Sequence, residues 1–107
     1  MPFDALTCAQ SLITLVNRPV QLIARSDGDL ARQIRRAASS VALNLAEGRG
    51  RRDGDQRRHY EMANGSAGEL TAALRIAQLH SYISREQYDA IDADLDRVRA
   101  MLWSLTH

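Results

Sequence analysis

The strongest constraint on the fold is the spacing of apolar residues, which repeats in steps of three and four along four successive segments. This is the a/d spacing of helices that lie nearly parallel to their neighbours and bury one face. Each segment is too short for an extended coiled coil, which favours a bundle of four helices. The four stripes are Leu6, Ala9, Ile13, Val16, Val20 and Ile23; Leu30, Ile34, Ala37 and Val41; Tyr60, Ala63, Ala67, Leu70, Leu74 and Ala77; and Tyr88, Ile91, Leu95, Val98, Leu102 and Leu105.

The breaks between the stripes place the helix ends. Ser26-Asp27-Gly28-Asp29 offers a glycine for a turn and an aspartate for a helix cap, and Ser84 with Gln87 has the spacing of a capping box. The middle break, 48–55, is longer and richer in glycine. The sequence therefore predicts one all-α domain over residues 1–107, an antiparallel up-down-up-down four-helix bundle. Its helices are expected at about 4–25, 29–47, 55–82 and 85–105.

Length and composition narrow the protein class. A chain of 107 residues has room for one domain, and 45% hydrophobic with 25% charged residues is ordinary for a globular protein. No apolar run approaches the length of a membrane span, and the N-terminus lacks the layout of a signal peptide. The single cysteine, Cys8, excludes an intramolecular disulfide. We therefore expect a cytoplasmic protein with no membrane segment.

The sequence also lacks the constellations that catalysis or metal binding requires. The three histidines have no metal-ligand spacing, and the two Asp-Gly-Asp segments lack the remaining ligands of a calcium loop. No paired carboxylates and no nucleophile with an adjacent base occur in a recognisable pattern. The expectation is a protein that is not an enzyme, with no cofactor, metal or small-molecule substrate.

Several polar residues stand where core residues are expected. Asn44 continues the apolar phase of the second helix, and Ser66 and Glu69 lie beside the stripe of the third. Gly65 and Gly68 interrupt that third helix at a cost of about 1 kcal/mol each, and small residues of this spacing allow close helix approach. One hypothesis is a structural hydrogen-bond network across helices, and the other is a ligand-binding or catalytic site. The proposed network contains Ser40, Asn44, Glu47, Ser66 and Glu69.

All fourteen basic residues are arginines, which either codon bias or recognition of phosphate and carboxylate groups explains. Between Glu47 and His59, five arginines face three acids, although the net charge of the chain is only +1. One hypothesis is that this loop contacts RNA or DNA phosphates. The alternative is a solvated loop whose arginines pair with Asp53, Asp55 or the acidic fourth helix of a neighbour. The candidate nucleic-acid-binding residues are Arg35, Arg36, Arg49, Arg51, Arg52, Arg57 and Arg58.

Two segments carry a resemblance to a known family. The stretch from Ser40 to Gly48 reads SVALNLAEG, and the stretch from Gly65 to Leu70 reads GSAGEL. They resemble a bacterial four-helix-bundle family that includes proteins encoded in intervening sequences of large-subunit ribosomal RNA genes. Accessory variability determinants of diversity-generating retroelements are its relatives. The similarity covers essentially the whole chain and implies a bundle that assembles into rings of five.

Two classes of function follow from these observations. The first is a ring-forming, pentameric scaffold that docks macromolecular partners through its helix faces. The second is a nucleic-acid-binding accessory protein that uses the arginine-rich loop 49–58. The resemblance implies nucleic acid and a reverse transcriptase as partners of the accessory relatives, which are strongly basic, whereas this chain is near neutral. The acidic fourth helix favours the scaffold.

Overall fold

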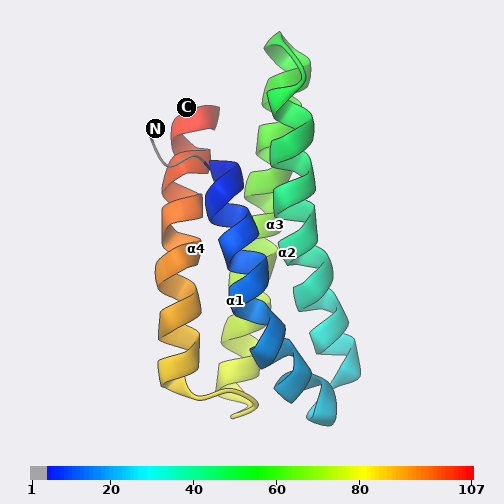
Figure 1. Ribbon diagram of the computed structural model, residues 1–107, viewed down its shortest axis with the longest axis vertical. Coiled ribbons are helices and arrows are strands. Elements are labelled where there is room, and N and C mark those ends of the chain that lie inside the picture. Colours follow the sequence, from blue (N-terminus) through cyan, green and yellow to red (C-terminus); the bar gives the residue numbers. More distant parts are fainter. Residues whose placement is uncertain (1–4) are drawn as a thin grey trace.

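A computed structural model describes residues 5–107, and within that range it contains four helices and no strand. They are α1 (Ala5–Ser26), α2 (Gly28–Arg49), α3 (Asp53–Leu79) and α4 (Arg85–Thr106). Successive helices pack side by side, and α4 returns to pack against α1 (Figure 1). The predicted all-α, up-down-up-down four-helix bundle is confirmed.

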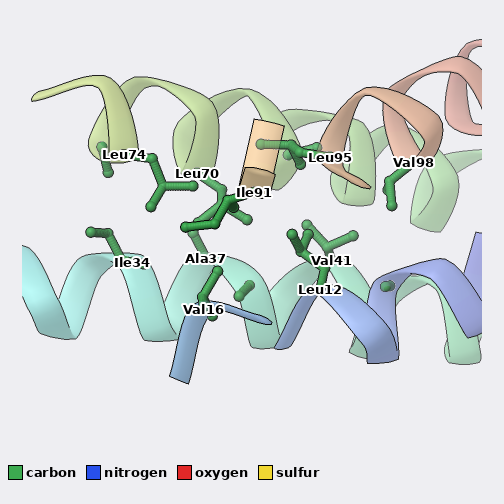
Figure 2. Packing of buried hydrophobic residues seen from close by; sticks show 14 of the residues in the cluster. Leu12, Val16, Ile34, Ala37, Val41, Leu70, Leu74, Ile91, Leu95 and Val98 are labelled. Atoms are coloured by element: carbon green, nitrogen blue, oxygen red, sulfur yellow. The ribbon is translucent and has the colours of Figure 1, made fainter. Parts of the chain in front are cut away.

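The core lies along the axis of the bundle and is built mainly from the four predicted stripes. The prediction is wrong at the end of the fourth stripe, where Leu105 is exposed and Thr106 is buried. Figure 2 shows side chains from all four helices meeting there, with Leu70 and Leu74 of α3 directed toward Ile34 of α2. Complete burial of each such side chain contributes about 1.5–3 kcal/mol relative to exposure. The largest fully buried side chains are Leu12, Ile23, Ile34, Leu45, Leu70, Leu74, Ile91, Leu95 and Leu102.

The connection between α1 and α2 is a single residue, Asp27. Its extended backbone turns the chain, and its side chain accepts a hydrogen bond of 3.0 Å from the Leu30 amide, as a helix cap does. Gly28 is therefore the first residue of α2 and not the turn. The helix α1 runs without interruption through Pro19, which is buried.

The end of α3 differs from the prediction. The helix ends at Leu79 and not at residue 82, because Ser81 adopts a left-handed conformation with φ of 65°. The Ser81 amide donates to the Gln78 carbonyl and the Tyr82 amide donates to the Ala77 carbonyl, both at 2.9 Å. These two bonds form a Schellman motif. The start of α4 agrees with the prediction, since Ser84 and Gln87 form a complete capping box.

The α2–α3 hairpin projects beyond the ends of α1 and α4 (Figure 1). Its close packing depends on Gly48, which is buried against Tyr60. A Cβ atom at position 48 would lie 2.5 Å from Cε1 of Tyr60, well inside van der Waals contact. The expectation that Gly65 and Gly68 allow close helix approach is wrong within the chain, because both are exposed and a Cβ at either position would meet open space.

Neither a membrane-spanning helix nor a metal-binding cluster occurs in the part of the chain that the structure describes. No helix there combines the length and the apolarity that crossing a membrane requires. No three His, Cys, Asp or Glu side chains of residues 5–107 come together as metal ligands.

Candidate functional site

The tip of the α2–α3 hairpin carries the arginine-rich segment, and much of its charge is neutralised locally. Arg51 lies 3.2 Å from Glu47 and 3.2 Å from Asp55, and Arg58 donates to the other Asp55 oxygen at 2.9 Å. The hydrogen bond from Arg58, with the nearby positive charges, lowers the pKa of Asp55. The hydrogen bond to Glu47 and the charges of both carboxylates raise the pKa of Arg51. These arginines therefore hold the tip together.

Arg57 links the hairpin to the end of α4. Its Nη2 atom donates to the Thr106 carbonyl oxygen at 2.8 Å, and its Nε atom lies 3.1 Å from Glu61. A cation at a helix C-terminus satisfies a carbonyl that has no partner in the helix and complements the helix dipole. This contact assigns Arg57 a structural role. The Arg52 side chain, in contrast, is exposed and makes no hydrogen bond or ion pair with any of residues 5–107.

Arg35 and Arg36 lie on the exposed surface of α2, apart from the tip. Arg49 lies thirteen residues after Arg36 on α2, which corresponds to about 20 Å along the helix axis. With Arg32 and Ser39 they line a shallow depression of about 310 Å³. Neither the Arg35 nor the Arg36 side chain makes an ion pair or hydrogen bond within the described chain. The seven candidate arginines are thus not brought together into one patch.

A chain of hydrogen bonds joins α2 to α3 below the tip. The hydroxyls of Ser40 and Ser66 lie 2.7 Å apart, and the Asn44 amide nitrogen donates to the carbonyl of Ser40 at 3.0 Å. His59 Nδ1 lies 3.2 Å from Asn44 Oδ1. Because this oxygen is an acceptor, Nδ1 of His59 is the donor, and a neutral His59 ring carries its proton there. His59 Nε2 then faces the Arg58 guanidinium at 3.4 Å as an acceptor.

Two residues of the predicted network lie outside this chain of hydrogen bonds. Glu47 is exposed and pairs with Arg51 of the tip, and the Glu69 carboxylate is exposed and has no hydrogen-bond or ion-pair partner among residues 5–107. Glu47 shares the helix face of Ser40, but its carboxylate pairs with Arg51 at the tip. Glu69 lies three residues after Ser66, about 60° around α3, and is exposed to solvent. His59 belongs to the network but was not among the predicted residues. Its spacing of seven from Ser66 is the sequence signal that places both on one face.

The fourth helix is less available as an acidic surface than its sequence suggests. Arg99 donates to the Thr71 hydroxyl at 2.7 Å and lies 3.1 Å from Asp92 and 3.2 Å from Asp96. Partial burial opposes the charged form of Arg99, but the two carboxylates outweigh it and raise its pKa. Part of the acidic face is therefore neutralised within the chain.

The outer surface of α3 carries a second set of residues at steps of three and four, which we name the outer α3 stripe. All of its members are exposed, and Met62, Ile76 and Leu79 are 46%, 45% and 66% exposed. Gly65 and Glu69 interrupt the run of apolar residues in this stripe. Because of this interruption the stripe is not recognisable from the sequence alone. The stripe consists of Met62, Gly65, Glu69, Ala72, Ile76 and Leu79.

On α2, Leu43 is 66% exposed. Leu43 also borders an apolar groove of about 400 Å³ between α1 and α2, which meets the arginine depression at Ser39. Of the six large exposed hydrophobic residues in the described part of the chain, four lie on α2 and α3. The outer faces of α2 and α3 therefore carry most of the large exposed apolar residues of the described chain.

Comparison with known proteins agrees with this architecture. The structure resembles the crystal structure of a protein of unknown function from the S23 ribosomal protein family of Bacteroides thetaiotaomicron VPI-5482. The TM-score is 0.87 at 20% sequence identity, over 95% of this chain and 97% of that one. No curated protein sequence matches. The model of the family described as 23S rRNA-intervening sequence protein matches residues 4–104. The chain therefore belongs to the 23S rRNA-intervening sequence protein family.

Proposed function

We propose that the protein is a self-associating helical scaffold whose copies pack through the outer faces of α2 and α3. The resemblance to the intervening-sequence protein family implies a ring of five copies. Such a ring would present the remaining helix faces to a macromolecular partner. The observation that carries the proposal is the exposed apolar surface formed by Leu43 and the outer α3 stripe.

Three physical arguments support this proposal. Large apolar side chains that gather on the outer surface of a soluble protein often mark an interaction site. A domain of this length buries only about two-thirds of its unfolded surface, so association adds burial that one copy cannot supply. Gly65 and Ala72 leave room on α3 for a neighbouring helix, because neither has a long side chain. Association would also offset the helix propensity lost at Gly65.

Sedimentation velocity over a range of micromolar concentrations tests the proposal. The wild-type protein is expected to sediment as an oligomer, and Ile76→Asp is expected to shift it toward the monomer. Leu105→Asp is the matched control, since Leu105 is 44% exposed on α4 and Ile76 is 45% exposed on α3. A wild-type protein that remains monomeric throughout, or an equal effect of both substitutions, would overturn the proposal.

A second candidate function is nucleic-acid binding through the hairpin tip. The observation that favours it is the projection of the tip beyond the bundle (Figure 1). Arg49 and Arg52 are exposed on this tip. A projecting arginine-rich tip can approach a phosphate backbone without obstruction from α1 or α4. The pairs that neutralise Arg51, Arg57 and Arg58 reduce the charge available for this purpose.

Titration of fluorescent RNA and DNA hairpins across a salt series tests this second candidate. Arg49→Ala with Arg52→Ala is expected to weaken binding and to reduce the log–log salt slope by about two. Arg97→Ala, at an exposed position of α4, is the control for a general loss of positive charge. Absence of binding at low salt would eliminate nucleic-acid binding and leave the scaffold.

A further inference from the structure

The exposed faces of α2 and α3 carry a matched pair of features. On α3, the carboxylate of Glu69 lies seven residues after Met62, and on α2, the guanidinium of Arg36 lies seven residues before Leu43. Seven residues correspond to two turns, or about 10.5 Å, on each helix. All four side chains are exposed, and neither charged group has a partner among residues 5–107. Each helix therefore presents one charge and one large apolar side chain at the same separation.

We propose that the outer α3 stripe of one copy docks on the outer face of α2 of the next copy, with Glu69 against Arg36 and Met62 against Leu43. The occupant of this surface is a second copy of the chain, because the charges and the spacing are complementary. This inference rests on the proposed self-association and specifies which surfaces meet and in which register.

The heights of these residues determine how the two copies are oriented. Ser40 and Ser66 are level within one chain, since their hydroxyls lie 2.7 Å apart. Arg36 lies four residues before Ser40, about 6 Å along α2, and Glu69 lies three residues after Ser66, about 4.5 Å along α3. Because α2 and α3 are antiparallel, both displacements run in the same direction along the bundle. Arg36 and Glu69 therefore lie at nearly the same height.

Leu43 and Met62 are level by the same reasoning. Leu43 lies three residues after Ser40 and Met62 lies four residues before Ser66, so both are about 4.5–6 Å toward the hairpin tip. Both contacts form together only if the neighbouring bundles point the same way and have almost no axial offset. Rotation without translation produces a closed assembly, whereas an open filament requires an axial step. The register thus agrees with a closed assembly.

Cysteine cross-linking tests the register. In a Cys8→Ser background, which removes the single cysteine, Leu43→Cys and Met62→Cys chains are prepared separately, mixed and oxidised. The mixture is expected to give a disulfide-linked dimer, while each variant alone gives at least about tenfold less, because a disulfide requires Cβ atoms about 4 Å apart. A chain that carries both cysteines is expected to give a ladder of bands above the dimer. Efficient linkage of Leu43→Cys to itself would overturn the register.

Exchanging the charges of Glu69 and Arg36 tests the register independently of cross-linking. Both side chains are exposed, so the substitutions leave the core of the bundle unchanged. Glu69→Arg is expected to weaken association about tenfold, and the combination with Arg36→Glu is expected to restore it. Sedimentation of the wild-type protein separates the two proposals. A monomeric wild type overturns self-association, whereas an oligomer that neither cross-links in the mixture nor responds to the exchange overturns only this register.

Discussion

At the scale of single residues, the packing of Gly48 against Tyr60 is the tightest constraint on the hairpin. Adding a methyl group there forces Tyr60 to move, because the new Cβ would lie 2.5 Å from its ring. We expect Gly48→Ala to lower the free energy of unfolding by about 1–3 kcal/mol despite the better helix propensity of alanine. Gly68→Ala, which meets open space, is expected to raise it by about 0.5–1 kcal/mol. Urea denaturation measures both, and an unchanged Gly48→Ala variant would contradict the tight contact.

Ser81 provides a second residue-scale prediction. It is a non-glycine residue in the left-handed conformation that ends α3, with φ of 65°. Since glycine adopts this conformation without the Cβ clash, Ser81→Gly is expected to stabilise the protein by about 1 kcal/mol. Ser84→Ala, which removes the cap of α4, is the opposing control and should destabilise it by about 1 kcal/mol. Thermal unfolding compares the two, and a lower melting temperature for Ser81→Gly would contradict this account of the helix end.

At the scale of the elements, the hairpin tip should respond to acid through Asp55. The pKa of this carboxyl is lower in the folded chain, chiefly because Arg58 donates a hydrogen bond to it. The ionised carboxylate therefore adds stability above the unfolded pKa of about 3.9, and that contribution is lost as the pH falls through the folded value. We expect exchange of the amides at the start of α3 to accelerate only below about pH 4. NMR detects this, and persistence of the acid step in Asp55→Asn would exclude Asp55 as its source.

The helices themselves could be predicted from the sequence, because each buries one stripe and the a/d spacing is long enough to be unambiguous. The end of α3 could not, since Ser81 gives no glycine signal for a left-handed residue. The local pairing of Arg51 with Glu47 and Asp55 was predictable from its spacing of four in both directions. The roles of Glu69 and His59 were not, because adjacent phases of α3 differ in exposure only once the bundle has formed.

At the scale of the whole molecule, the fold is preserved while most residues change. A TM-score of 0.87 at 20% identity to the Bacteroides protein shows that the arrangement of four helices tolerates replacement of most residues. The outer faces of α2 and α3 are not needed for this pattern, yet they carry most of the large exposed apolar residues that the structure describes. We therefore propose that those faces make the contacts between copies.

Native mass spectrometry of the unmodified protein tests that central claim most directly. One chain has a mass of 11.9 kDa. Self-association into a closed ring predicts one dominant species at a whole multiple of this mass, five copies by the family resemblance, without a ladder of larger assemblies. A spectrum that contains only the 11.9 kDa monomer at every micromolar concentration would contradict the account.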